Sequence, residues 1–271
     1  MSGVRDNLSV LMRRMFGQGR PAGPAMAPPG TVLYAIGDIH GEAEALRRLL
    51  GHIAADARRY SGCDPVLIFL GDYVDRGPDS RGVIDCLSAP PLPGFACHAL
   101  LGNHEQAMLG FLDDPVAGAP WLAFGGVETL ASYGVRASFG SIDAARCRRL
   151  RDEALEVIPA RHIAFLRTLK PMLVIGDYAF VHAGIRPGRA LDKQSCGDLL
   201  TIRGPFLTSR RIHEKVIVHG HTIVPEPISL DNRIAIDTGA YASGILTAVA
   251  LWQGQRRFIR SDQDATSRCV R

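Results

Sequence analysis

The sequence predicts an α/β protein in which two β-sheets pack against each other and helices lie outside them. Two observations support this prediction. From residue 31 to residue 112, apolar runs of strand length alternate with amphipathic runs of helix length, which is typical of a mainly parallel sheet. After Pro171 the apolar runs follow one another across short turns, which predicts a β-rich half. At 271 residues the chain is long enough for one large domain that contains both halves.

Three strand–helix pairs account for the first half. We predict strands at residues 32–36, 66–70 and 97–101. The helices after them cover residues 42–59, a segment around Ile84, and residues 105–112. In the first helix Leu46, Leu49 and Ile53 recur on one face, as the helical period requires.

The second half changes from helical to β-rich. Residues 121–169 contain amphipathic runs of helical period, so we expect helices there. The run MLVIGDYAFVHAG predicts two strands around a Gly-Asp turn. Three more strands are predicted in the runs KVIVHGHT, RIAIDTGA and ILTAVALWQG.

The two ends differ from this pattern. Residues 1–30 end in a stretch rich in Pro, Gly and Ala, so we expect a flexible N-terminal leader. One domain then covers residues 31–260, and residues 261–271 form a C-terminal tail.

Composition excludes several classes of protein. The formal charge of +4 is small for this length, so no nucleic-acid partner is expected, and the basic run RCRRLR is interpreted as a solvated helix face. No apolar run approaches the roughly 18 residues that a membrane span needs. The six cysteines form no CxxC pair, which is typical of reduced thiols. We therefore expect a cytoplasmic protein.

Polar side chains follow the predicted strands in five short motifs: GDIHG, GDYVDRG, GNHE, VHAG and VHGHT. Because the carboxyl ends of parallel strands meet at one edge of a sheet, these side chains are expected to converge there. The residues are Asp38, His40, Asp72, Asp75, Arg76, Asn103, His104, His182, His219 and His221. A mixed set of imidazole, carboxylate and amide ligands favours Mn²⁺, Fe or Zn²⁺ over Ca²⁺ or Mg²⁺. The sequence therefore predicts a metal site.

This ordered set of motifs resembles the phosphoprotein phosphatases of the calcineurin-like metallophosphoesterase superfamily, above all their bacterial and phage members. The resemblance covers about residues 31–254 and includes the runs WLAFGG, TLASYG and TIRGPFL. It implies a four-layer αββα fold, with two packed mixed sheets flanked by helices, and a catalytic domain over residues 31–260. It also implies two divalent metal ions, with Mn²⁺ expected and Fe or Zn²⁺ as alternatives.

The resemblance assigns a role to each motif residue. The first ion would be held by Asp38, His40 and Asp72, and the second by Asp72, Asn103, His182 and His221. In the last motif the implied ligand is His221, which leaves His219 beside the site or in the core.

Substrate contacts and the general acid come from the same motifs. Arg76, Arg203 and Asn103 would contact the phosphate group, although a surface salt bridge is the alternative for Arg203. His104 would protonate the leaving group, held in place by Asp75. Tyr241 would border the pocket, with a packing role as an equal alternative.

The implied function is a metal-dependent serine/threonine protein phosphatase, open to dual specificity, that acts on phosphoprotein substrates. It would hydrolyse phosphomonoesters by direct attack of a metal-bridging hydroxide. The alternative is a symmetrical diadenosine tetraphosphatase, whose corresponding motifs tend to read GDLVARG and GNHD. Asp75 and Glu105 depart from those motifs and favour the protein phosphatase. A binding-only relative is disfavoured because no implied ligand is missing, and nucleic-acid cleavage because no aromatic-basic stripe is present.

Overall fold

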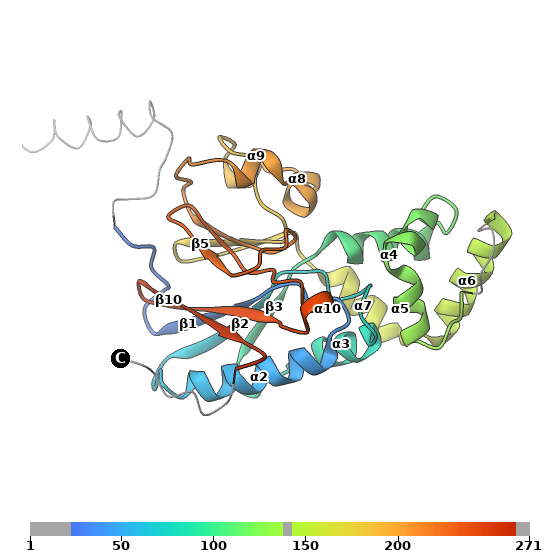
Figure 1. The fold of residues 1–271 in the computed structure, drawn as a ribbon, viewed down its shortest axis with the longest axis horizontal. Coiled ribbons are helices and arrows are strands. Elements are labelled where there is room, and N and C mark those ends of the chain that lie inside the picture. Colours follow the sequence, from blue (N-terminus) through green and yellow to red (C-terminus); the bar gives the residue numbers. More distant parts are fainter. Residues whose placement is uncertain (1–22, 138–142, 264–271) are drawn as a thin grey trace, which may run out of the picture.

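Two five-stranded mixed sheets face each other in the computed structural model, which describes residues 23–137 and 143–263. Helices cover the outer faces of the two sheets (Figure 1). The strand orders are β10-β9-β1-β2-β3 and β4-β5-β6-β8-β7. This arrangement confirms the predicted fold of two packed mixed sheets flanked by helices.

The first sheet combines both ends of the domain. Its parallel strands are β1 (Thr31–Ile36), β2 (Asp64–Phe69) and β3 (Ala96–Ala99). Strands β9 (Thr247–Trp252) and β10 (Gln255–Arg260) join them in antiparallel pairs next to β1. The two sheets therefore do not correspond to the two halves of the sequence, because the last two strands return to the first sheet.

The second sheet is built from the middle of the β-rich half. Strands β4 (Met172–Ile175) and β5 (Tyr178–Val181) form the predicted antiparallel hairpin. Strands β6 (Val216–His219) and β8 (Arg233–Ala235) extend the sheet in parallel, and the short β7 (Ile228–Ser229) closes its edge.

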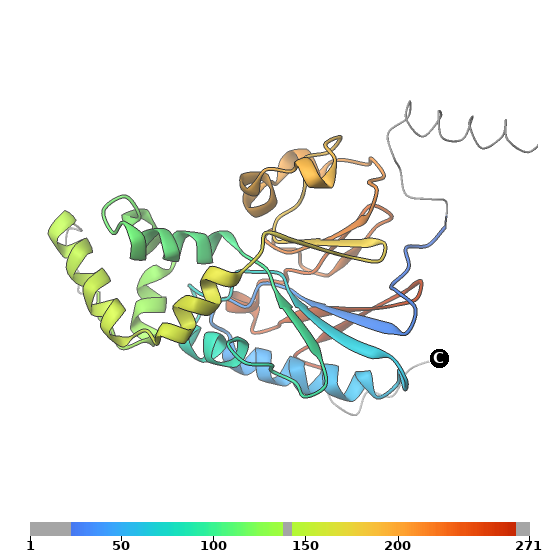
Figure 2. The ribbon, with the colours of Figure 1, turned by 180° about the vertical axis from the view of Figure 1, so that it is seen from behind.

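Helices form the outer layers and one end of the molecule. Figures 1 and 2 show α2 (Ala43–Ala57) and α3 (Ser80–Leu87) beneath the first sheet, and α8 (Cys196–Thr201) and α9 (Gly204–Leu207) above the second. A helical group lies beyond the carboxyl ends of β1 to β3. It contains α4 (Asn103–Asp113), η1 (Ala119–Phe124), α5 (Gly126–Ser132), α6 (Ala144–Val157) and α7 (Ala160–Thr168). The remaining helical turns are η2 (Leu191–Lys193) and α10 (Ala240–Ser243).

The core is divided between the layers by the alternation of side chains along each strand. In β1, Leu33 packs into the layer between the sheets, whereas Tyr34 packs with Leu46 and Leu49 of α2. A third cluster, which includes Phe206, fills the space between the second sheet and α8 and α9. Since both sheets are covered on both faces, polar loops lie at the ends of their strands. The motif loops follow the carboxyl ends.

The domain extends past the boundaries that the sequence predicted. Ala25 and Ala27 are buried, and the Ala27 N–H donates to the Gln253 carbonyl at 2.9 Å. Ser261 is also buried and pairs with Leu246. The leader therefore ends before residue 25, and the tail begins after residue 261; residues 1–22 and 264–271 lie outside the described residues. Within the described part of the chain, no helix combines the length and apolarity that crossing a bilayer requires.

Candidate metal centre and active site

Four of the motifs line one cleft of about 520 Å³, and His182 of the VHAG motif is buried beside it, against Asp72. The motifs arrive there on the loops that follow β1, β2, β5 and β6 and on the first turn of α4. The polar lining consists of Asp38, His40, Asp72, Arg76, Asn103, His104, Arg203, His221, Thr222, Asp237 and Tyr241. The structure thus brings together residues that are up to about 200 positions apart in the sequence. In α/β proteins such residues commonly meet in the crevice outside the carboxyl ends of the strands.

Asp72 lies at the centre of this cleft. Its Oδ2 is 3.5 Å from His40 Nε2 and 3.3 Å from His182 Nε2. Two groups of potential metal ligands share it: His40, Asp72 and His104 form one, and Asp72, His182 and His221 form the other. The close approach depends on Gly102, since a Cβ there would lie 2.2 Å from Asp72 Oδ1. A residue shared by both groups is placed to bridge two ions.

Hydrogen bonds fix which nitrogen each buried histidine turns toward the cleft. His40 Nδ1 donates to the Val74 carbonyl at 2.8 Å, and His182 Nδ1 donates to the Leu70 carbonyl at 3.0 Å. Because a carbonyl only accepts, Nδ1 carries a proton in both residues, and Nε2 is the nitrogen left to face the cleft. The Nε2 of His182 also lies 2.9 Å from Asn103 Oδ1 and 3.1 Å from His221 Nδ1. These atoms converge as metal ligands would.

Negative charge accumulates beneath the histidines. Burial raises the pKa of Asp38 well above its usual range, and the neighbouring carboxylates of Asp237 and Asp72 raise it further. Burial also raises the pKa of Asp237. For Asp72 the effect of burial is outweighed by His182, His104 and His40, which hold its pKa well below the ordinary value. A divalent cation would balance this group of carboxylates, so the residues fit a bound metal.

Two of the expected ligand histidines are kept neutral, which metal binding requires. Burial lowers the pKa of His40 to about 4, despite the nearby Asp72. Burial lowers the pKa of His221 to about 3, and the charges of His182 and Arg203 add to the effect. The His221 backbone N–H donates to the Asp38 carboxylate at 3.0 Å, which ties the last motif to the first.

His104 and Asp75 form the expected pair. His104 Nδ1 donates to Asp75 Oδ2 at 2.6 Å. Burial lowers the pKa of His104, but the hydrogen bond that it donates to Asp75 and the charge of Asp72 outweigh burial and raise the pKa above the ordinary value. With Nδ1 bound to Asp75, the Nε2 of His104 is the atom that faces the cleft, 3.9 Å from Asp72 Oδ2. This is the orientation of a general acid.

Two residues that the motifs did not single out hold Asp75. The indole Nε1 of Trp121 donates to Asp75 Oδ2 at 2.9 Å, and the Thr129 hydroxyl donates to Oδ1 at 2.6 Å. Both come from the helical region between the motifs, and Trp121 belongs to the run WLAFGG. The available signal was a tryptophan that would need a partner for its N–H if buried.

Glu105 joins two of the motif loops from below. Its carboxylate is fully buried and accepts four backbone N–H groups. They belong to Asp72 at 2.9 Å, Tyr73 at 2.7 Å, Val74 at 3.3 Å and Gly102 at 2.9 Å. Glu105 therefore acts as the acid of a helix-capping turn and also fixes the backbone around Asp72.

The two arginines lie at the cleft with different surroundings. The Arg76 guanidinium lies 4.7 Å from the ring centre of Tyr241, and its Nη2 is 3.4 Å from His104 Nε2. Arg203 donates from Nη1 to the Thr222 hydroxyl at 3.3 Å. Tyr241 thus packs on Arg76, and its ring centre also lies 5.5 Å from that of His40, with the two rings nearly perpendicular.

His219 lies away from this centre. It is fully buried in β6, its Nδ1 donates to the Gly220 carbonyl, and its ring meets Phe206 at 5.0 Å. Phe206 belongs to the cluster on the far side of the second sheet. His219 is therefore a core residue.

The loops of the site have an unusual backbone. Among the described residues, six that are not glycine have positive φ. Five belong to the motifs: His40 (46°), Asp72 (53°), Asp75 (73°), Arg76 (70°) and His221 (62°). This left-handed conformation costs a side-chain-bearing residue about 1–2 kcal/mol, and such strain concentrates at functional sites.

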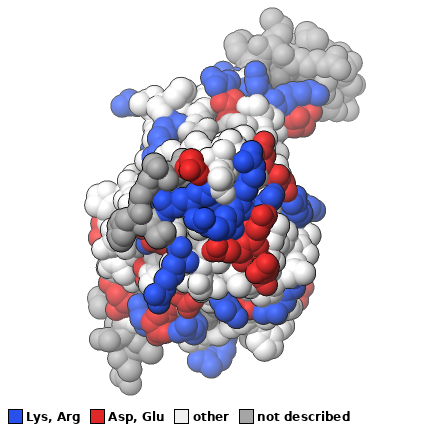
Figure 3. Space-filling model, turned by 90° about the vertical axis from the view of Figure 1, so that its right-hand side faces the viewer, with Lys and Arg blue, Asp and Glu red and all other residues white. Residues whose placement is uncertain are grey.

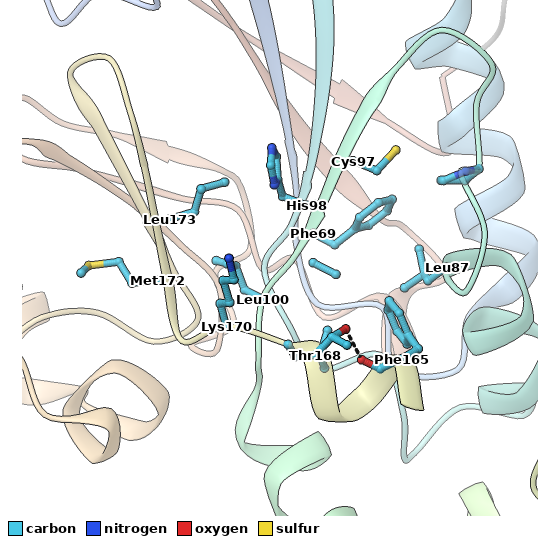
Figure 4. A pocket seen from close by; sticks show the side chains of 13 residues that line it. Phe69, Leu87, Cys97, His98, Leu100, Phe165, Thr168, Lys170, Met172 and Leu173 are labelled. Atoms are coloured by element: carbon cyan, nitrogen blue, oxygen red, sulfur yellow. Dashed lines mark hydrogen bonds between the residues drawn. The ribbon is translucent and has the colours of Figure 1, made fainter. Parts of the chain in front are cut away.

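A second pocket has a different character. Figure 4 shows it at the open edges of β3 and β4, beside α7. Its volume is about 290 Å³, and its lining is mostly apolar, with Phe69, Leu87, Phe165 and Leu173. It contains His98 and Lys170 but no carboxylate, so its lining does not offer a metal site.

The basic run on α6 does not form an unbroken positive surface. Figure 3 views the side of the molecule where α6 lies, and Asp and Glu side chains lie directly beside the central group of Lys and Arg. Arg149 pairs with Glu153, and Arg151 pairs with Asp152. The mixed charge agrees with a solvated helix face.

Comparison with known proteins identifies the family. The sequence model of the calcineurin-like phosphoesterases matches residues 31–225, which include all five motifs. The chain belongs to the calcineurin-like phosphoesterase family. Since the buried Asp and His groups fit a two-metal site, this phosphoesterase is a metal-dependent hydrolase. The narrower assignment to phosphoprotein phosphatases does not follow from this match.

Relatives of this phosphoesterase include nucleotide hydrolases. The bis(5′-nucleosyl)-tetraphosphatase PrpE [asymmetrical] of Geobacillus thermodenitrificans is 30% identical over 234 residues, 79% of this chain and 88% of that protein. The protein of that name from Anoxybacillus flavithermus is 29% identical with the same coverage. A symmetrical bis(5′-nucleosyl)-tetraphosphatase of Delftia acidovorans is 33% identical over 158 residues, 57% of this chain and 45% of that protein.

Solved structures show the shared fold. A candidate diadenosine tetraphosphatase superposes with a TM-score of 0.60 at 19% identity, over 88% of this chain and 98% of that one. A cold-active protein-tyrosine phosphatase of a Shewanella species superposes with a TM-score of 0.53 at 19% identity, over 86% and 83% of the two chains. At these identities the likeness concerns the fold alone.

Proposed function

We propose that this phosphoesterase hydrolyses bis(5′-nucleosyl) tetraphosphates such as diadenosine tetraphosphate. The observation that carries the proposal is the match to tetraphosphatases near 30% identity along 88% of their length. The sequence motifs ranked this activity second, after a protein phosphatase. The relatives support tetraphosphate hydrolysis better than protein dephosphorylation, because the asymmetrical tetraphosphatases match 79% of the chain and not only the metal-binding motifs.

The charge of the cleft supports a polyphosphate substrate. Arg76 and Arg203 both line it, and a guanidinium binds phosphate oxygens with two parallel hydrogen bonds. The volume of about 520 Å³ exceeds that of a single phosphate group. A chain of several phosphates carries more oxygens and more negative charge for the two arginines than a single phosphate group does.

The proposed ligands are the residues that the motif resemblance implies. Asp38, His40, Asp72, Asn103, His182 and His221 would hold two divalent ions, with Mn²⁺ expected and Fe or Zn²⁺ as alternatives. The convergence of His40, Asp72, His182 and His221 in the two groups of potential ligands supports this set. Such a pair of ions supplies charge neutralisation and activates water for attack on phosphorus.

The other side chains divide the remaining tasks. Arg76 and Arg203 would orient the phosphate chain, and Nε2 of His104 would give a proton to the departing oxygen. Asp75 holds His104 in that orientation through the 2.6 Å hydrogen bond. Asn103 Oδ1 lies 2.9 Å from His182 Nε2, so Asn103 is placed to bind the same metal ion as His182.

A serine/threonine protein phosphatase remains the second candidate, and the His104–Asp75 pair favours it. An alkoxide departs poorly without a proton, so a well-oriented acid matters most for alkyl phosphates. A nucleotide phosphate is a better leaving group and needs this acid less. Phosphoprotein substrates therefore stay a prediction.

One side-by-side assay separates the two functions. The Mn²⁺-loaded protein would be given diadenosine tetraphosphate, a phosphoserine peptide and a phosphotyrosine peptide. We expect kcat/KM for the dinucleotide to exceed that for either peptide by at least about tenfold, which corresponds to 1.4 kcal/mol of transition-state stabilisation. Release of ADP alone indicates symmetrical cleavage, whereas ATP with AMP indicates asymmetrical cleavage. Turnover confined to the peptides would overturn the proposal.

Metal dependence is tested with matched variants in the same assay. Chelation should abolish turnover, and Asp72→Asn should bind less metal because Asp72 is shared by both ligand groups. Asp152→Asn, an exposed change on α6, is the control and should bind metal as the wild type does.

A further inference from the structure

Phe124 stands out at the mouth of the cleft. With 62% of its surface exposed, it exceeds every other exposed large apolar side chain in the described part of the chain. It lines the same cleft as Asp72, Arg76 and His104. Ligand pockets are lined by apolar and aromatic side chains together with a few polar groups, so an exposed phenylalanine in this cleft is placed to contact a ligand.

The position of Phe124 is fixed by the site itself. It is the last residue of η1, whose Trp121 donates to Asp75. The next residue, Gly125, has a φ of 111°, and a Cβ there would lie 2.7 Å from the Arg76 backbone nitrogen. The backbone beside Phe124 therefore packs directly on the loop that carries Asp75 and Arg76.

The cleft is lined by one phenylalanine and one tyrosine, and of these two Phe124 is the one available to a ligand. The Arg76 guanidinium lies over the ring of Tyr241, which also contacts His40 in an edge-to-face arrangement. Among the described residues, no aromatic ring or arginine stacks on Phe124. Ile223, which also lines the cleft, is 49% exposed and adds a second apolar side chain.

We propose that Phe124 is a stacking platform for a nucleobase of the substrate, next to the phosphate-binding arginines. This inference rests on the proposed function and deepens it, because it assigns the part of the cleft that would recognise the nucleoside. A base has a flat face that stacks on an aromatic ring whatever its hydrogen-bonding edge. The platform would therefore favour nucleotides over bare phosphate chains without selecting adenine strictly.

The test compares ligands with and without a base. Binding of ATP and of inorganic tripolyphosphate to the Mn²⁺-loaded protein is measured by calorimetry for the wild type, Phe124→Ala and Phe124→Trp. Phe124→Ala should weaken ATP binding by about 5- to 160-fold, the range for losing one stacked base. Tripolyphosphate binding should stay within about twofold, since uninvolved surface changes have small effects. Phe124→Trp should bind ATP at least as tightly as the wild type.

Turnover gives the second readout. Phe124→Ala should raise KM for diadenosine tetraphosphate with little change in kcat, as loss of uniform binding predicts. Leu155→Ala, which removes an exposed apolar side chain on α6, is the matched control, and it should change neither parameter. Melting curves of all variants establish that each is folded.

The outcomes separate the two levels of the argument. Equal ATP affinity in wild type and Phe124→Ala, or an equal loss for ATP and tripolyphosphate, would overturn the platform. If the wild type binds ATP through Phe124 but cleaves only phosphopeptides, the platform stands and the proposed reaction fails. A loss of phosphotyrosine-peptide binding in Phe124→Ala without a loss for ATP would assign the ring to a protein substrate and reject the inference.

Discussion

Single residues decide the chemistry of this site, and His104 is the clearest case. Replacing His104 with Asn should lower kcat on an alkyl phosphate by about 10²- to 10⁴-fold, with a smaller change in KM. The loss should be smaller for an aryl phosphate, because its leaving group departs without a proton. His98→Asn, an exposed histidine on β3, serves as control. Equal losses of His104→Asn on both substrates would contradict the role of a general acid.

The candidate metal ligands were also the part of the site most accessible to sequence reasoning. Asp38, His40 and Asp72 follow strands whose apolar runs mark their ends, so their convergence follows from strand direction alone. Residues that act through a hydrogen bond were harder to find. The partner of Trp121 is 46 positions away, and nothing in the local sequence indicates that its indole meets Asp75. Asp237 was likewise hidden in a strand ending that resembled core.

At the scale of elements, Glu105 connects α4 to the loop after β2. Glu105→Gln should leave two of its four backbone donors without an acceptor, because an amide nitrogen donates and does not accept. We expect a loss of about 2–5 kcal/mol in the free energy of unfolding. Metal affinity should fall about 10- to 100-fold, as for other residues that orient metal ligands.

The measurements for Glu105 are urea unfolding and metal titration of the same preparations. Glu128→Gln, an exposed change on α5, controls for loss of a negative charge. A Glu105→Gln protein with wild-type metal affinity would show that the loop around Asp72 keeps its shape without this carboxylate.

Helix α7 carries a pH-dependent contribution to stability. Burial lowers the pKa of His162 below its ordinary value, although Asp85 opposes the shift. The unfolded histidine, with a pKa of about 6.5, therefore takes up a proton at a higher pH than the folded one. The contribution of neutral His162 to the free energy of unfolding is therefore fully present above the unfolded pKa of about 6.5. It is lost as the pH falls from that value toward the lower pKa of the folded state.

We therefore expect the free energy of unfolding to fall less in His162→Gln than in the wild type as the pH drops from about 7.5 to about 5.5. This window brackets the pKa of the unfolded histidine. Urea unfolding at several pH values measures the slope. The Tyr133 hydroxyl and Asp85 both contact His162, so the variant is compared by slope rather than by absolute stability. Identical slopes would show that His162 titrates alike in both states.

The element pattern was predictable where periodicity was strong and less so where contacts between distant segments decide. The strand–helix pairs of the first half and the hairpin of β4 and β5 appear where the apolar runs place them. The pairing of β9 with β1 could not be predicted from the sequence. The apolar pattern of a strand indicates that the strand is buried, but it does not indicate which strand lies next to it. The short α8, α9 and α10 have too few residues for a helical period to show.

For the whole molecule, the domain boundary gives a sharp test. Removing residues 1–28 deletes the buried Ala25 and Ala27, the 2.9 Å bond from Ala27 to Gln253, and the Ala25 carbonyl that accepts from Tyr178. Removing residues 1–22 deletes none of these. The longer truncation should therefore unfold about 1–3 kcal/mol more easily than the shorter one. Denaturant unfolding of both proteins checks this, and equal stability would place the domain boundary at residue 30 after all.

The left-handed backbone at the five motif residues has a consequence for how this protein can change. Each of these residues has a backbone conformation that glycine would adopt with less strain. The five residues together therefore lower the stability of the folded protein. A selection for heat resistance alone should therefore find its gains at these positions first. The selected variants would be more stable but inactive. Only a selection that also requires turnover would retain the five strained residues.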